Sequence, residues 1–155
     1  MPRIAHPAFA VPGAMDSLIS LSKASKAVPG VPLGLLELMH LRASQINGDG
    51  NNVNLHPRLA RAAGETSEDR IISVASWRNT PWFTEPERAA LALTEAVTRL
   101  DDRADPVPDE IWNEARRHYD EPVLAAMLLS LGLVNLWNRL HVATGQVAEP
   151  AKPAA

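Results

Sequence analysis

The stretch Pro32–Pro57, PLGLLELMHLRASQINGDGNNVNLHP, decides the fold and contains the best candidates for chemistry. Apolar side chains recur through its first half at helical spacing, with a proline at the start and an Asn-Gly pair at the end. This pattern predicts a helix from about Pro32 to Gln45. The Asn-Gly and Asp-Gly pairs that follow are strong turn formers, so a tight connection is expected up to Pro57.

The rest of the chain also has helical patterns, and no window shows the alternation typical of a β-strand. Glycines, prolines and capping residues mark the expected ends, including a capping box formed by Thr84 and Glu87. The expected fold is therefore all-α, a single-domain bundle of about seven helices. The other expected helices are Ala14–Lys26, Pro57–Ala63, Glu68–Trp77, one from Thr84 to Leu100, Pro108–Tyr119 and Glu121–Thr144.

Prolines also set the expected boundaries of the domain. Pro2, Pro7 and Pro12 predict an irregular N-terminal arm over residues 1–13. Residues 14–146 form the expected helical domain, and residues 147–155 form a Pro/Ala-rich tail that we expect to be mobile.

The composition limits the classes of function. The 155 residues carry a formal charge of −3, so no basic excess favours nucleic acid. The apolar stretch Val123–Val134 is shorter than the roughly 20 residues of a membrane span, and no secretion signal is visible. There are no cysteines, which excludes disulfides and thiol chemistry. We expect a soluble cytoplasmic protein with no nucleic-acid or membrane partner.

Glu37 is the first candidate for chemistry because it lies on a leucine stripe, with Leu33 and Leu41 four residues away on either side. A carboxylate there needs a partner or faces a cavity. Desolvation would raise its pKa and make it a proton carrier. The alternative is a glutamate at the edge of a helix, paired with an arginine such as Arg42.

His56 is the second candidate. The proline after it predicts a position just before a helix N-terminus, where the helix dipole favours a neutral imidazole that can accept a proton. The alternative is a histidine that only caps the helix or bonds a carbonyl. His40 and His141 lie in expected helices and are interpreted as packing residues. Asn135 and Asn138 are interpreted as partners in hydrogen bonds between helices or subunits.

Five segments together resemble the alkylhydroperoxidase D-like and carboxymuconolactone decarboxylase family. They occur in order over roughly residues 14 to 146, and no single segment is decisive. The segments are LLELMHLRASQING (35–48), RAAGET (61–66), ASW (75–77), ERAALALTEAV (87–97) and NLWNR (135–139).

The resemblance assigns roles to two positions, and the residues found at two others exclude one mechanism of the family. In the redox branch of this family, a glutamate and a histidine assist a pair of cysteines, and the matching positions here are Glu37 and His56. The two cysteine positions are occupied by Asp49 and Asn52, so the thiol peroxidase mechanism is impossible. Pro57 stands where the family continues a helix, which predicts a helix that starts later or is kinked near His56.

The decarboxylase branch does not rely on a cysteine pair. The resemblance therefore implies a thiol-independent acid–base enzyme for a small organic acid or lactone, of the decarboxylase, isomerase, lyase or dehydratase type. Glu37 and His56 would carry protons, and Asp49, Asn51 and Asn52 would bind substrate or orient a water, with no cofactor or metal expected. This hypothesis predicts that Glu37 and His56 converge on an apolar cavity.

Two alternatives remain open. A catalytically silent homologue, acting as a ligand-binding protein or a scaffold, predicts that Glu37 and His56 are locked in hydrogen bonds with no cavity beside them. A divalent metal site could be formed by Glu37, Asp49 and His56, with Asn52 as a further ligand. Members of the family are typically homo-oligomers, so assembly is expected in either case.

Overall fold

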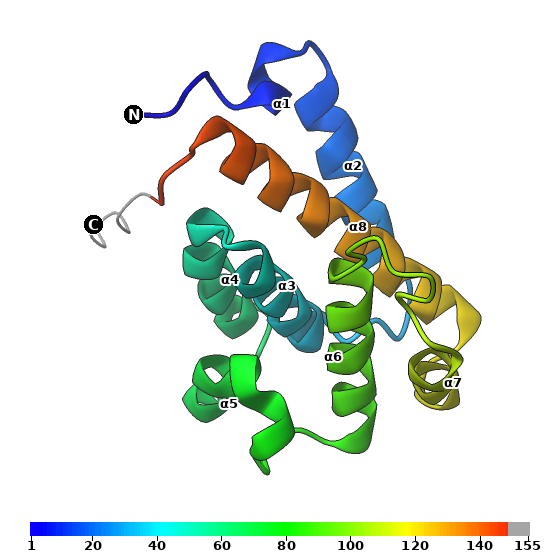
Figure 1. Cartoon of the computed structure of the whole chain (residues 1–155). Coiled ribbons are helices and arrows are strands. Elements are labelled where there is room, and N and C mark those ends of the chain that lie inside the picture. Colours follow the sequence, from blue (N-terminus) through cyan, green and yellow to red (C-terminus); the bar gives the residue numbers. More distant parts are fainter. Residues whose placement is uncertain (149–155) are drawn as a thin grey trace.

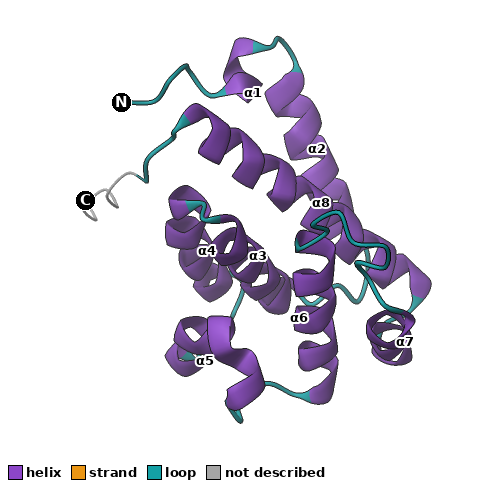
Figure 2. Cartoon of the chain, in the orientation of Figure 1, coloured by secondary structure: helices purple, strands orange, loops and turns teal. Residues whose placement is uncertain are grey.

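The computed structural model describes residues 1–148, and the helices of this part are joined by loops without any strand (Figures 1 and 2). The all-α class predicted from the sequence is confirmed. The elements are α1 (Pro7–Ala10), α2 (Ala14–Lys26), α3 (Leu33–Asn47), α4 (Gly50–Ala62), α5 (Glu68–Ser73), the 3-10 helix η1 (Val74–Asn79), α6 (Glu85–Thr98), α7 (Asp109–His118) and α8 (Glu121–Thr144).

Helix α3 lies at the centre of the fold and packs against α4, α6 and α8 (Figure 1). Its side chains Leu36, Leu38 and Met39 are fully buried. Successive residues point in different directions around a helix, so burial of three such neighbours requires other elements on several sides. The leucine-rich pattern of α3 thus specifies a helix that is covered nearly all round.

Helix α8 is the longest helix of the described chain and packs along both α2 and α3. By length and composition alone it could cross a membrane, with a mean hydropathy of 1.5 over its most apolar window. However, 56% of that window is buried inside the fold, which is typical of a core helix. The long apolar helix is therefore accounted for by packing against its neighbours.

The expected helices agree closely with the observed ones at several places. The bounds of α2 and α8 match the prediction, and the capping box of Thr84 and Glu87 is present at the start of α6. The expected helix Glu68–Trp77 is divided into α5 and η1, and within η1 the residue Ser76 leaves the helical conformation.

The N-terminal arm is more ordered than expected. It contains the short helix α1, which begins at Pro7 and is capped by the imidazole of His6. The backbone N–H of Arg3 donates to the carbonyl of Thr144 at 2.7 Å, so the arm is held against the end of α8. Residues 149–155, most of the expected tail, lie outside the described residues.

The prediction for α4 was wrong, because this helix begins at Gly50 and contains Pro57 instead of starting there. The carboxylate of Asp49 caps α4 by accepting hydrogen bonds from the backbone N–H groups of Asn51 and Asn52. The Asn-rich segment that predicts a loop therefore forms the first turn of a helix. His56 consequently lies in the second turn of α4 and not before its N-terminus.

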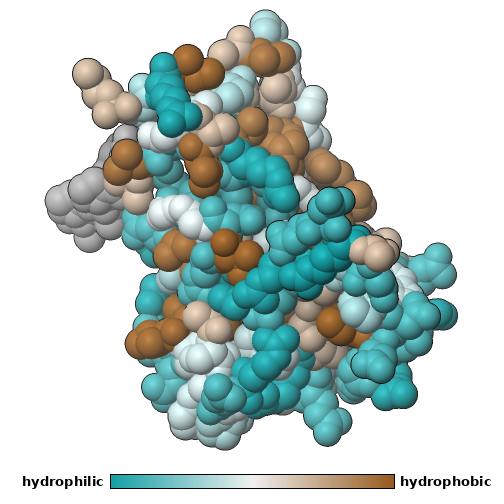
Figure 3. Space-filling model, viewed as in Figure 1, coloured by the Kyte–Doolittle hydropathy of each residue, from teal (hydrophilic) through white to brown (hydrophobic). Residues whose placement is uncertain are grey.

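The surface is mostly polar, but apolar side chains gather on part of it. Figure 3 shows them in the upper half of the view, where α2 lies in Figure 1. On α8, Leu129 is 51% exposed and Leu136 is 38% exposed. These residues belong to an apolar face that residues 1–148 leave uncovered.

Candidate functional site

Glu37 lies in the middle of α3 and is almost completely buried, with 3% of its surface exposed. Its Oε1 accepts a hydrogen bond from Nζ of Lys26 at 2.6 Å, and its Oε2 lies 2.7 Å from Nδ1 of His56. The expected alternative partner, Arg42, instead pairs with Glu95 at 2.7 Å. The Glu37 carboxylate thus joins α2, α3 and α4 at one point.

The contacts of Glu37 reverse the pKa shift expected from its burial. Desolvation by itself raises the pKa of this carboxyl group, but the nearby His40 together with the hydrogen bonds from His56 and Lys26 lowers it far below the ordinary value. Glu37 is therefore an ionised carboxylate at neutral pH. It is suited to orient a neighbouring group and not, as the sequence suggested, to exchange protons itself.

The ionised Glu37 fixes the orientation of the His56 ring. A carboxylate can only accept hydrogen bonds, so the proton of this contact belongs to Nδ1 of His56. In the neutral ring, Nε2 is then an unprotonated acceptor. This nitrogen is buried and has no hydrogen-bond partner in the described chain.

A second histidine, His40, lies on the same face of α3 as Glu37, three residues further on. Its Nδ1 is 3.6 Å from Oε2 of Glu37, and its Nε2 is 2.8 Å from Oγ of Ser130. Burial lowers the pKa of His40 to about 4, so this ring is neutral at pH 7. The rings of His40 and His56 meet edge to face, with 4.9 Å between their centroids.

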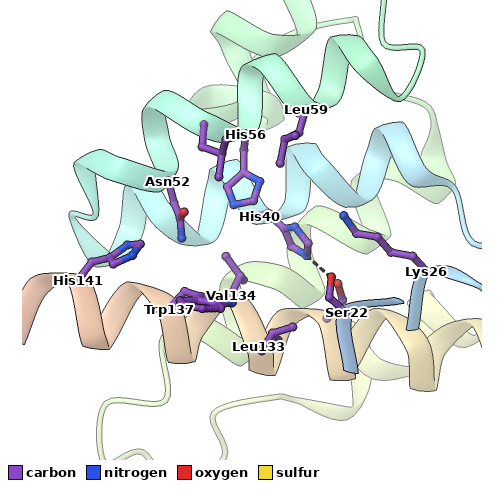
Figure 4. A pocket seen from close by; sticks show the side chains of 12 residues that line it. Ser22, Lys26, His40, Asn52, His56, Leu59, Leu133, Val134, Trp137 and His141 are labelled. Atoms are coloured by element: carbon purple, nitrogen blue, oxygen red, sulfur yellow. Dashed lines mark hydrogen bonds between the residues drawn. The ribbon is translucent and has the colours of Figure 1, made fainter. Parts of the chain in front are cut away.

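The rings of His40 and His56 border a cavity of about 340 Å³ between α2, α4 and α8, whereas Glu37 is not part of its lining (Figure 4). Most of its exposed wall is apolar, and the polar groups are few. The sequence-predicted residues His56 and Asn52 line the cavity. The other lining residues are Ser22, Lys26, His40, Leu55, Leu59, Ser130, Leu133, Val134, Trp137 and His141.

Asp49 and Asn51 lie beside the cavity but are not part of its lining. Oδ1 of Asp49 caps α4, and its Oδ2 accepts hydrogen bonds from Nδ2 of Asn138 at 2.9 Å and from Nδ1 of His141 at 2.8 Å. Asn51 donates its backbone N–H to Asp49. Of the three predicted substrate-binding residues, the structure therefore brings only Asn52 to the cavity wall.

The ligand atoms of Glu37, His40 and His56 lie within 4.8 Å of one another, which is close enough to consider a metal ion. This set differs from the expected one, because Asp49 bonds other groups. The ammonium group of Lys26 contacts Glu37 directly, so a divalent cation would bind beside an existing positive charge. The electrostatics therefore favour a cluster that positions protons over one that holds a metal.

Sequence reasoning missed several residues of this site, namely Lys26, Ser130 and the two histidines interpreted as packing residues. The spacing of Glu37 and His40 on one helix face was an available signal. Lys26 and Ser130 had no such signal, because they reach the site from other helices. By contrast, Asn138 confirms the expected hydrogen bonding between helices, since its Nδ2 also donates to Oγ of Ser44 at 3.0 Å.

The structure predicts that replacing Glu37 by Gln removes a pH-dependent part of the stability. Because the folded-state pKa is lowered, the ionised carboxylate stabilises the fold above its unfolded pKa of about 4.5, and this contribution is lost as pH falls below that value. Glu37→Gln should lower the free energy of unfolding at neutral pH by about 3–5 kcal/mol. Urea denaturation at several pH values measures this difference, which should shrink in acid.

Glu114→Gln is the matched control, because Glu114 is also paired with a histidine but lies on the surface. We expect this variant to unfold at nearly the same urea concentration as the wild type at neutral pH. A Glu37→Gln variant that is as stable as the wild type at every pH would contradict the assigned charge of Glu37.

Comparison with known proteins agrees with this fold. The family model of the carboxymuconolactone decarboxylase family matches residues 12–96. The uncharacterized protein YdfG of Bacillus subtilis is 37% identical over 112 residues, which cover 72% of this chain and 74% of YdfG. This relative, like the family model, covers more than half of the present chain.

Solved structures show the same arrangement of helices. A protein of unknown function from Agrobacterium tumefaciens, thought to be the antioxidant defence protein AhpD, superposes with a TM-score of 0.86 at 30% identity. The match covers 97% of this chain and all of that one. The debrominase Bmp8, as a cysteine-to-alanine variant with 2,3,4-tribromopyrrole, gives a TM-score of 0.80 at 18% identity, covering 91% of this chain and 73% of Bmp8. The protein described here belongs to the carboxymuconolactone decarboxylase family.

Proposed function

We propose that this protein is a thiol-independent enzyme that transfers protons on a small organic acid or lactone, with His56 as the general base. The observation that carries this proposal is the environment of the His56 ring. Its Nδ1 is held by the ionised Glu37, while its Nε2 is buried, unpaired and part of a ring that lines the cavity. A buried nitrogen that lacks a partner in the protein is available to a bound molecule.

The charges around the ring support its role as a base. When Nε2 takes up a proton, the imidazolium that forms lies 2.7 Å from a carboxylate that stabilises it. Glu37 acts as a positioning residue for His56, in the way that a buried carboxylate orients a catalytic histidine. This assignment differs from the expectation that Glu37 itself exchanges protons.

The size and lining of the cavity support a small substrate. A volume of about 340 Å³ lies at the lower end of the range for ligand pockets, and its wall is mostly apolar. Lys26 supplies the positive charge of the lining, and 34% of its side chain is exposed. An anionic substrate such as a carboxylate would be attracted to that side of the cavity.

Isomerases, lyases and dehydratases that act on carbonyl compounds use a base and an acid to remove and add protons, and decarboxylases add a proton after carbon dioxide leaves. The protein is proposed to belong to this group of enzymes. The alternative of a silent homologue is favoured by the hydrogen bonds that lock Glu37 to His56 and Lys26. A cavity beside these residues was expected only for an active site, and His56, although not Glu37, lines one. With Nε2 of His56 also unpaired in the described residues, the enzyme is the stronger candidate.

His56→Asn tests this proposal with little damage to the structure. The amide nitrogen of Asn can occupy the place of Nδ1 and still donate to Glu37, but the acceptor at Nε2 is removed. Proton NMR in D₂O should follow deuterium uptake and product formation for a panel of small oxo acids and unsaturated lactones. We expect the variant to lose about 10²–10⁴-fold of the rate shown by the wild type.

His118→Asn is the matched control, because His118 lies on α7 and is not part of the cavity lining. It should keep the full rate. A His56→Asn variant as active as the wild type would rule out His56 as the base. A wild type that is stabilised thermally by a compound of the panel, but never exchanges its protons, would favour the ligand-binding alternative.

We further propose that the chain forms a homo-oligomer through the apolar face of α2 and α8. This proposal is supported by a groove of about 440 Å³ whose lining is almost wholly apolar and includes Leu129 and Leu136. Leu133 lines both this groove and the cavity, so an assembly on this face would lie next to the candidate site.

Light scattering should therefore give a mass that is a multiple of 16.8 kDa at micromolar concentration. Leu129→Glu should shift the protein toward the monomer, because it places a charge on the apolar face. A wild-type monomer at this concentration would contradict the proposed assembly.

A further inference from the structure

A second pair of a carboxylate and an imidazole lies at the cavity, formed by Asp49 and His141. Nδ1 of His141 is 2.8 Å from Oδ2 of Asp49, and Asp49 is 2% exposed. The ring of His141 forms part of the cavity lining, as does the ring of His56 (Figure 4). The site thus contains two histidines that are each held through Nδ1 by a buried carboxylate.

The protonation of this second pair follows from the contacts of Asp49. Burial raises the pKa of Asp49, but hydrogen bonds from His141 and Asn138 and the charge of His141 outweigh burial and lower it. The ionised carboxylate can only accept, so Nδ1 of His141 carries the proton. Its Nε2 has no hydrogen-bond partner within the described chain and remains available to a ligand.

The neighbours of His141 hold its ring without using Nε2. The ring of His6 meets it edge to face, with 5.0 Å between the centroids, and Trp137 lies 6.1 Å away. Nδ1 of His6 accepts a hydrogen bond from the backbone N–H of Ala8. The carboxylate that bonds His141 is that of Asp49. Burial, together with the charge of His141, lowers the pKa of the neighbouring His6.

Asn52 lies between the two histidines. It precedes His56 by one helical turn on α4, and Figure 4 shows its side chain between those of His56 and His141. Its amide group lines the cavity and makes no side-chain hydrogen bond within the described residues. It can therefore donate to an oxygen atom of a bound molecule.

We infer that His141, positioned by Asp49, is a second proton-transfer residue, and that the cavity isomerises a small unsaturated carbonyl compound by an allylic proton shift. This inference rests on the proposed role of His56. The two histidines supply the base and the acid that such a shift needs on its two carbon atoms.

The atoms balance without any further reactant. Nε2 of His56 takes the proton from the carbon beside the carbonyl group, and the electron pair of that C–H bond forms an enolate. The amide of Asn52 donates a hydrogen bond to the enolate oxygen. Nε2 of protonated His141 then gives a proton to the far carbon of the double bond. The product is an isomer of the substrate, and solvent returns both rings to their starting states.

His141→Asn separates a catalytic role of His141 from a structural one. The amide of Asn can still donate to Asp49 from the position of Nδ1, but the nitrogen that reaches the cavity is lost. With a panel of unsaturated oxo acids and lactones in D₂O, the variant should retain deuterium uptake at the carbon that His56 deprotonates. Isomer formation should fall by about 10²-fold or more.

The outcomes distinguish this inference from the proposed function. If His56→Asn abolishes deuterium uptake while His141→Asn forms isomers at the wild-type rate, His141 is structural and only this inference fails. If the wild type neither takes up deuterium nor forms isomers on any compound, both fail. His118→Asn again serves as the control for the substitution itself.

A measurement on the wild-type chain covers the case in which the variant does not fold. Diethyl pyrocarbonate acylates imidazole nitrogens that are unprotonated and accessible, and peptide mass spectrometry locates the product. We expect modification of His141, whose ring forms part of the cavity lining, but not of His40, whose Nε2 contacts Ser130. A chain that is unmodified at His141 would overturn the inference.

Discussion

The buried carboxylate of Glu37 is the interaction on which the candidate site depends. An ionised group at 3% exposure is tolerated only because a lysine from α2 and a histidine from α4 satisfy its two oxygen atoms. The same contacts fix the relative positions of three helices. They also decide which nitrogen of His56 carries the proton, so the stability of the fold and the chemistry of the cavity have a common origin.

Asp49 and Asn52, which the family resemblance matches to the cysteine pair of redox members, have different contacts in this structure. Asp49 caps α4 and holds His141, while Asn52 presents an amide to the cavity. Asp49 thus belongs to a hydrogen-bond network that includes Asn138 of α8.

The sequence predicted the class of fold and much of the helix pattern, because apolar periodicity and caps are local signals. Helix α8 is the clearest example, since Pro122 near its start and Gly145 after its end mark both of its boundaries. The prediction from the sequence failed at α4, where Asn residues and Pro57 predicted a loop but the cap by Asp49 favours a helix. Tertiary contacts of Asp49 with α8 support that cap, and no local pattern reveals them.

The candidate site was predictable only in part for the same reason. Glu37 and His56 could be chosen from the sequence, whereas the direction of the pKa shift of Glu37 depends on its contacts. His40 contributes from the same helix, but His56 and Lys26 reach the carboxylate from other helices. His141 was interpreted as a packing residue because its partner, Asp49, is 92 residues away in the chain. Burial alone predicts a raised pKa for Glu37, and its hydrogen-bond partners reverse the sign.

The central claim is that ionised Glu37 holds the proton of His56 on Nδ1 and leaves Nε2 as an acceptor in the cavity. Long-range proton–nitrogen correlation NMR on the histidine-labelled protein measures this directly, with the signals of His56 assigned from the spectrum of His56→Asn. The account predicts that neutral His56 has a protonated Nδ1 and an unprotonated Nε2. A protonated Nε2 and a bare Nδ1 in the neutral ring would contradict it.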